Sequence, residues 1–86
     1  MRATVFSDGG ELSREQVEVL EKVGKRFPGL TVEVLPADGD AAMDAGILVP
    51  PGLVIDGITL SVGKVLSPGR VRRFLLQHGT SPGGDS

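Results

Sequence analysis

The most constraining feature of the sequence is the run Gly46–Gly57, which reads Gly-Ile-Leu-Val-Pro-Pro-Gly-Leu-Val-Ile-Asp-Gly. Proline fixes one backbone torsion and has no amide hydrogen. The pair Pro50-Pro51 is therefore incompatible with the interior of a helix or a central strand. The apolar triplet Leu53–Ile55 that follows is typical of a strand covered on both faces. Asp56-Gly57 is a strong signal for a tight hairpin. The run therefore predicts a buried strand that turns back into a second strand over residues 58–62.

The N-terminal half predicts a strand, a helix and another strand. Residues 2–7 form the first strand, which Asp8-Gly9-Gly10 closes. A helix follows and ends at Pro28-Gly29, with Ser13 and Gln16 as a capping box at its start. Residues 30–35 alternate as a half-buried strand does. The apolar face of the helix is expected to comprise Leu12, Gln16, Val19, Leu20, Val23 and Phe27.

Two further helices complete the pattern. Residues 38–45 suffice for a short helix, capped by Asp38 or Asp40 and ended by Gly46. Turn and cap duty also explains the nearby Asp44 better than a calcium loop does, because the spacing of an EF-hand is absent. Ser67-Pro68 opens the last helix as cap and first helical residue, and Gly79 ends it.

The resulting order, β-α-β-α-β-β-α, predicts an α/β domain over residues 1–79 and a flexible C-terminal tail over residues 80–86. A right-handed crossover makes the first two strands parallel, and the hairpin adds two antiparallel strands. We therefore expect a four-stranded mixed sheet flanked by three helices. The first and last helices should cover one face and the short helix the other, with the second and fourth strands at the edges.

Composition limits the chemistry available to this chain. Its 86 residues suffice for one domain, and the absence of cysteine excludes disulfides, a thiol nucleophile and thiolate-bound metals. A net charge of −2, with three Phe and neither Tyr nor Trp, disfavours nucleic-acid binding. No apolar run approaches the roughly 20 residues of a membrane span. We expect a cytoplasmic protein with no cofactor, no metal and no membrane contact.

The chain resembles the small thioredoxin- and glutaredoxin-like domains of archaea and bacteria. In that family a Gly-Cys-x-x-Cys turn follows the first strand, and a Gly-Val-x-x-Thr-Pro-x-Leu-Val-Ile-Asp-Gly run leads into the hairpin. The second motif is matched here at Gly46, Ile47, Pro51, Leu53, Val54, Ile55, Asp56 and Gly57. The resemblance covers about residues 2–79. It implies a thioredoxin-like fold with Pro51 at the position of the family's cis-proline.

The departures from the family decide the expected chemistry. Gly10 and Ser13 stand where the resemblance places the two cysteines, and thiol–disulfide exchange needs a thiolate. The only histidine, His78, is expected far from Ser13, so no base is in place to activate that hydroxyl. The family's oxidoreductase mechanism is therefore excluded, and we expect no enzyme. Pro50 precedes the cis-proline position and lacks the amide that the family offers to a bound peptide.

These observations favour a non-catalytic, thioredoxin-like protein that acts as a protein-binding or accessory module. The partner is expected to be another protein or a second copy of the chain. The expected surface is either an exposed sheet edge or the region around the degenerate active-site positions, comprising Asp8, Gly9, Gly10, Ser13, Val49 and Pro50.

Two alternatives stay open. Gly9-Gly10 before a helix could hold a small anion, or the domain could be an accessory subunit of a redox system. Ser13 is either a helix cap or a relic of a resolving cysteine. The basic residues of the first and last helices are either solvated faces or a charged partner surface; they are Lys22, Lys25, Arg26, Arg70, Arg72 and Arg73.

Overall fold

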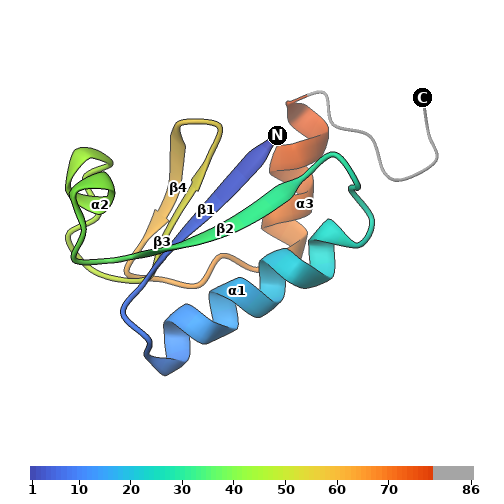
Figure 1. Ribbon diagram of the computed structural model, residues 1–86. Coiled ribbons are helices and arrows are strands. Elements are labelled where there is room, and N and C mark those ends of the chain that lie inside the picture. The colour runs from blue at the N-terminus through green and yellow to red at the C-terminus, as the bar shows by residue number, and fades with distance from the viewer. Residues whose placement is uncertain (79–86) are drawn as a thin grey trace.

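The computed structural model describes residues 1–78, so the predicted terminator Gly79 and the tail 80–86 lie outside the described residues. The elements follow the predicted order (Figure 1). They are β1 Arg2–Ser7, α1 Glu11–Gly24, β2 Thr31–Pro36, α2 Asp40–Asp44, β3 Gly52–Ile55, β4 Ile58–Val62 and α3 Pro68–Gln77.

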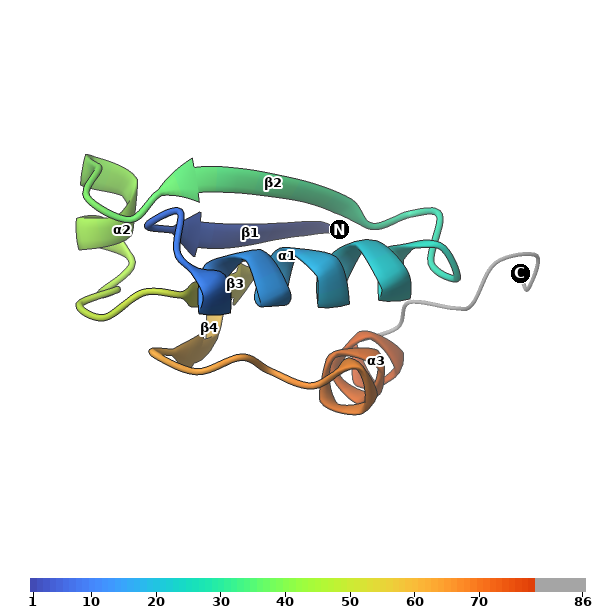
Figure 2. The same ribbon diagram turned by 90° about the horizontal axis from the view of Figure 1, so that it is seen from below.

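The four strands form one mixed sheet in the order β2-β1-β3-β4. β1 and β2 are parallel, with Val5 beside Val34, while β1–β3 and β3–β4 are antiparallel. The predicted mixed sheet and its two edge strands are therefore confirmed. This arrangement puts the carboxyl ends of β1 and β2 and the beginning of β3 at the same end of the sheet, which we call the loop end (Figures 1 and 2).

The predicted hairpin joins β3 to β4. Asp56 and Gly57 have φ values of 48° and 82°, the left-handed backbone that a tight two-residue hairpin requires. The Asp56 carboxylate also accepts a hydrogen bond from the Arg2 amide at 2.8 Å. The strand register shifts between Leu53 and Val54, which leaves an irregularity in the ladder opposite residue 60. The hairpin is thus fastened to the start of β1 as well as paired with itself.

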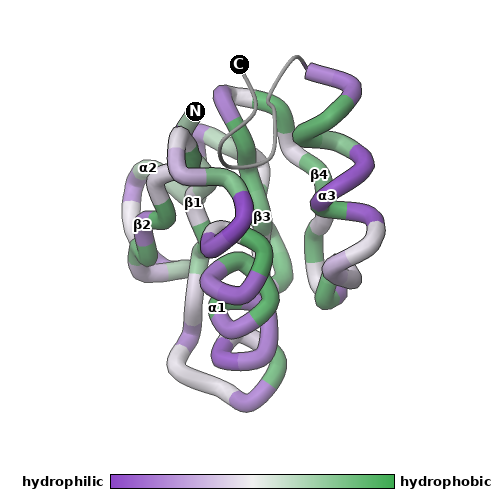
Figure 3. Tube along the Cα trace, turned by 90° about the vertical axis from the view of Figure 1, so that its right-hand side faces the viewer, coloured by the Kyte–Doolittle hydropathy of each residue, from purple (hydrophilic) through white to green (hydrophobic). Residues whose placement is uncertain are grey.

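Two apolar clusters lie on opposite faces of the sheet. The larger one joins the inner sides of α1 and α3 to alternate residues of the central strands; its fully buried members include Val5, Leu20, Leu53, Ile55, Val71 and Leu75. The smaller one lies under α2 and contains Phe6, Ala42 and Ile47. In Figure 3 the strand β3 is hydrophobic, whereas hydrophilic and hydrophobic residues alternate along α1 and α3. The expected division of the helices between the two faces is confirmed.

The predicted start of α1 is wrong in its details. The helix begins at Glu11 with Gly10 as N-cap and no side-chain cap, so Ser13 and Gln16 do not form a capping box. Both side chains are instead fully buried, as is Leu20 on the same inner face. Leu12, which the sequence places on the inner face, is 51 % exposed because the inward face passes through its neighbour Ser13. Spacing alone could not distinguish these two faces of the first turn.

Gln16 fastens α1 to the segment before α3. Its side-chain amide donates to the Leu66 carbonyl at 3.2 Å, and its oxygen accepts from the Leu66 amide at 2.7 Å. One side chain thereby satisfies both backbone groups of a residue 50 positions away in sequence. A buried amide in this position acts as a tertiary clamp.

The predicted cap of α2 is wrong, whereas the predicted start of α3 is confirmed. α2 has Gly39 as N-cap without a side-chain bond, so neither Asp38 nor Asp40 caps it. α3 starts as predicted, because Ser67 Oγ accepts from the Arg70 amide at 3.4 Å and Pro68 occupies the first helical position. Of the helices in residues 1–78, none combines the length and apolarity needed to cross a membrane.

Candidate functional site

The turn between β1 and α1 is organised by Asp8. Its Oδ1 accepts hydrogen bonds from the Gly10 amide at 2.8 Å and from the Ser13 hydroxyl at 2.9 Å. The Asp8 amide in turn donates to Ser13 Oγ at 3.3 Å, and the Gly9 amide donates to Ser7 Oγ at 3.0 Å. Four of the expected site residues, Asp8, Gly9, Gly10 and Ser13, are therefore brought together in one network.

These hydrogen bonds favour the charged form of Asp8. The Gly10 amide first, and the Ser13 hydroxyl second, hold the pKa of the Asp8 carboxyl below its ordinary value, although desolvation acts against them. The carboxylate lies just before the first turn of α1, where the helix dipole favours a negative charge. The protein's own carboxylate thus occupies the place where an external anion would lie.

The backbone N–H groups of this turn are already used in hydrogen bonds and are not available to a ligand. Those of Asp8, Gly9 and Gly10 all donate to side chains within the turn. An incoming phosphate would have to displace these bonds and approach the Asp8 carboxylate, which repels it. The paired amides and the Asp8 carboxylate therefore disfavour an anion at Gly9-Gly10.

Ser13 is not arranged as a nucleophile. Its side chain is fully buried, and its hydroxyl proton points to a carboxylate whose lowered pKa makes it a weak base. His78 lies at the far end of α3, where its ring stacks on Phe74 with centroids 4.0 Å apart. Ser13 therefore has a structural role: it joins the turn to the core. It does not act as the predicted helix cap.

Gly10 is explained by the same turn. A Cβ built on it would lie 2.9 Å from Asp8 Oδ1, closer than real side chains approach. Its backbone, with φ −81° and ψ 178°, needs no glycine. A side chain at this position would require the Asp8 carboxylate to shift, so Asp8 and Gly10 form a matched pair.

The second half of the loop end is the segment before β3. The Pro50–Pro51 peptide bond is cis, as the resemblance implies, and Pro51 is buried. Val49 is 57 % exposed and lies against Gly63, where an added Cβ would come within 3.2 Å of its side chain. The Gly63 amide donates to the Pro51 carbonyl at 2.8 Å. The segment is thus held by the loop that follows β4.

Gly52 fixes the other side of this segment. A Cβ at this position would meet three side-chain atoms of Ile47 at 2.6 to 2.9 Å. Ile47 is only 5 % exposed and belongs to the cluster under α2. The absence of a side chain at residue 52 lets Ile47 fold back and turn the chain toward the cis bond.

A hollow of about 490 Å³ joins the two halves of the loop end. Asp8 and Pro50, both expected site residues, lie on its wall together with Ser7 and the segment after β2, Pro36–Asp38. No family model and no curated protein matches this chain. The function must therefore be argued from the side chains that the loop end presents.

Those side chains are unusually apolar. Leu48 is 85 % exposed, Met43 74 %, Val49 57 % and Leu12 51 %. All four belong to the first turn of α1, to α2 or to the segment before β3. Sequence reasoning missed Leu48 and Met43, although an apolar residue in the loop between Gly46 and Pro50 has no helix or strand face to occupy. Among residues 1–78, no group of His, Asp or Glu side chains is arranged to hold a metal ion.

Proposed function

We propose that the protein is a non-catalytic relative of the small thioredoxin-like domains and that it acts by binding another protein at the loop end. The observation that carries the proposal is the exposure of Met43 on α2 and of Leu48 and Val49, which directly precede Pro50 on the wall of the hollow. The turn that would hold the family's thiols is instead closed by the bonds of Asp8 to Gly10 and Ser13. The surface is retained, whereas the reactive groups are absent.

The energetics support docking at this surface. Burial of a Val, Leu or Met side chain stabilises a complex by about 1.5–3 kcal/mol each, so the three side chains supply roughly 4–9 kcal/mol. Association costs several kcal/mol in lost rigid-body freedom, so this gain suits a complex of moderate affinity. Clusters of exposed apolar side chains on small domains commonly mark interaction sites.

Pro50 shapes what can dock. It has no amide to offer, so a bound segment receives hydrogen bonds only at other positions and is held mainly through side-chain contacts. An accessory place in a redox complex is one form of this proposal, and it predicts that a reductase co-purifies with the protein. The proposal includes the cytoplasmic location expected from the sequence.

The test compares two matched pairs of substitutions in the full chain. Leu48→Asp with Val49→Asp puts charge on the loop end. Val34→Asp with Ile58→Asp puts the same charge on the two edge strands, where those side chains are 50 % and 43 % exposed. Affinity capture from native lysate with wild-type and variant baits identifies retained partners, sedimentation reports self-association, and far-UV circular dichroism checks the fold.

A partner or dimer that is lost with the first pair and kept with the second supports docking at the loop end. Loss with the second pair alone moves the interaction to a sheet edge and contradicts the proposal. A monomer that retains no partner contradicts it as well.

A further inference from the structure

Charge is segregated along the chain. Between Glu21 and Glu33 there are three basic residues and no acidic one, and between Asp56 and Asp85 there are four basic residues and no acidic one. These two stretches hold seven of the nine basic residues: Lys22, Lys25, Arg26, Lys64, Arg70, Arg72 and Arg73. A chain with a net charge of −2 therefore has one strongly basic region.

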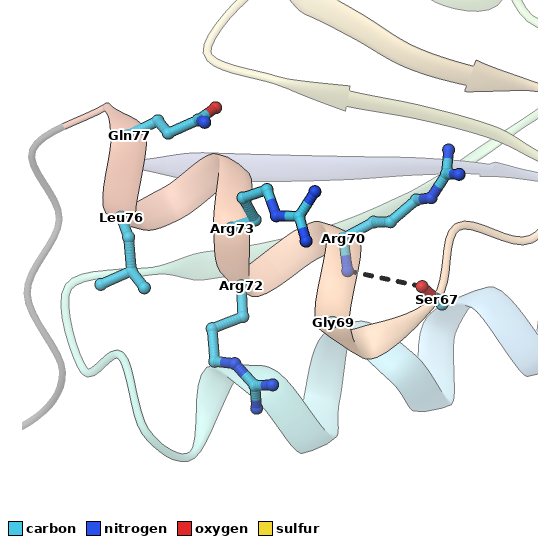
Figure 4. A pocket seen from close by; sticks show the side chains of 7 residues that line it. All are labelled: Ser67, Gly69, Arg70, Arg72, Arg73, Leu76 and Gln77. Carbon is cyan, nitrogen blue, oxygen red and sulfur yellow. Dashed lines mark hydrogen bonds between the residues drawn. The ribbon is translucent and has the colours of Figure 1, made fainter.

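The fold brings the two stretches together. Lys22 and Arg26 near the end of α1 line a hollow with Pro68 and Arg72 of α3. On its other flank, α3 presents Arg70 and Arg73 (Figure 4). A broad depression of about 660 Å³ over the outer side of α3 includes all three arginines together with Leu76. We call Arg70 and Arg73, which share this flank, the arginine face.

Within residues 1–78, no carboxylate forms an ion pair with the guanidinium groups of the arginine face or of Arg72. All three residues are exposed. Arginine offers a planar set of donors that matches a carboxylate in two-point contact, so Arg70 and Arg73, one helical turn apart, are suited to pair with carboxylates.

Apolar side chains lie beside these charges. Arg70 and Arg73 border a hollow of about 390 Å³ whose other walls are Leu60, Leu66, Phe74 and Gln77. Leu60, Leu66 and Phe74 are only partly buried, and Leu76 is 49 % exposed. The hollow is of a size that accepts one bulky apolar side chain.

We propose that the arginine face, together with the hollow between α3 and β4, binds an acidic protein segment that carries an apolar anchor. Carboxylates of the segment pair with Arg70 and Arg73, and the anchor packs on Leu60, Leu66 and Phe74. This surface is separate from the loop end, and the inference does not rest on the function proposed above.

The observations favour a protein segment over a nucleic acid. The hollow ends in aliphatic side chains and one phenyl ring, and the chain has neither Tyr nor Trp for stacking bases. A nucleic acid is an extended polyanion that needs a long basic surface, whereas the overall charge of this chain is −2. A short acidic segment meets only the basic region.

The test uses defined probes and the intact protein. A labelled synthetic peptide with glutamate and leucine in alternation is titrated by fluorescence anisotropy at low and high salt. Two comparison probes are the same peptide with glutamine in place of every glutamate and an oligothymidylate of similar length. Arg70→Glu with Arg73→Glu reverses the charge of the hollow, and Arg14→Glu on α1 is the matched control, because Arg14 is also exposed but lies outside both basic stretches.

We expect the acidic peptide to bind and to bind more weakly at high salt. Its affinity should fall about tenfold with the double variant, since each exposed ion pair contributes only a few-fold. Arg14→Glu should leave binding unchanged, and amide shifts should lie within residues 60–77. Equal binding of the glutamine peptide, tighter binding of the oligothymidylate, shifts confined to other residues, or no binding would each overturn the proposal.

Discussion

The clamp made by Gln16 gives the sharpest prediction about stability. Replacement of Gln16 by Glu keeps the shape of the side chain but removes the two hydrogens that its amide nitrogen carries. A carboxylate still accepts from the Leu66 amide, but it cannot donate to the Leu66 carbonyl, which the native amide meets at 3.2 Å. Only the protonated carboxyl can restore both bonds. Since the position is fully buried, the charged form is penalised by desolvation as well.

The sign and size of the effect follow from linkage. Burial and the missing donor raise the pKa of the new carboxyl in the folded protein above its value in the unfolded chain. The variant is therefore close to wild type below the unfolded pKa, near pH 4, and loses about 1.4 kcal/mol per pH unit above it until the pH reaches the raised pKa of the folded state. At neutral pH the loss reaches about 3 kcal/mol or more. A domain of 86 residues has a total stability of roughly 4–13 kcal/mol, so this loss is a large share.

Urea unfolding monitored by far-UV circular dichroism measures the effect, since the chain has no Tyr or Trp to report by fluorescence. Wild type and variant are compared at each pH, so that other titrating groups cancel. Gln16→Leu is the second variant: it should lose roughly 1–3 kcal/mol with little dependence on pH, because it leaves the Leu66 backbone groups without partners. A Gln16→Glu protein that is equally stable relative to wild type at about pH 4 and about pH 7 would refute the clamp.

Three further predictions concern the loop end. The lowered pKa of Asp8 stabilises the fold at pH values above the unfolded pKa, and this contribution is lost as the pH falls through the folded pKa. The variant Asp8→Asn should therefore be less stable than wild type at neutral pH. Its stability should also depend less on pH in an acid titration. The double variant Gly10→Cys with Ser13→Cys should catalyse thiol–disulfide exchange, measured as the reduction of insulin by dithiothreitol. Either single variant should stay inactive. An inactive double variant would weaken the proposed family relationship. Gly52→Ala should destabilise the protein by about 1–3 kcal/mol in urea unfolding, because its methyl group collides with Ile47, and an unchanged midpoint would contradict this close contact.

The sequence was sufficient to predict the secondary structure and topology because several local signals agreed. The Asp56-Gly57 hairpin and the Ser67-Pro68 helix start each depend on near neighbours, and both appear in the structure. The strand predicted over residues 30–35 is present as β2, but its alternation is imperfect, since Val34 is 50 % exposed. Ser13 and Gln16 were interpreted wrongly because their hydrogen-bond partners lie outside the helix. Gln16 bonds a residue 50 positions away, and Ser13 bonds back to Asp8 across the turn. A capping box has the same spacing as these two buried side chains, so sequence spacing could not separate the two interpretations.

The distribution of charge bears on which partner can dock at the loop end. A second copy of the chain would dock symmetrically, with the same patch on both subunits. Such a contact would bring together two sets of acidic residues, since Asp8 and Asp38 line the hollow and Asp40 and Asp44 lie on α2. Like charges facing each other oppose association, and low salt makes this opposition stronger. We therefore expect the purified protein to sediment as a monomer at neutral pH and low salt, and the loop end to prefer a partner that combines an apolar patch with basic residues. A stable dimer under these conditions that Leu48→Asp abolishes would show instead that apolar burial outweighs this repulsion.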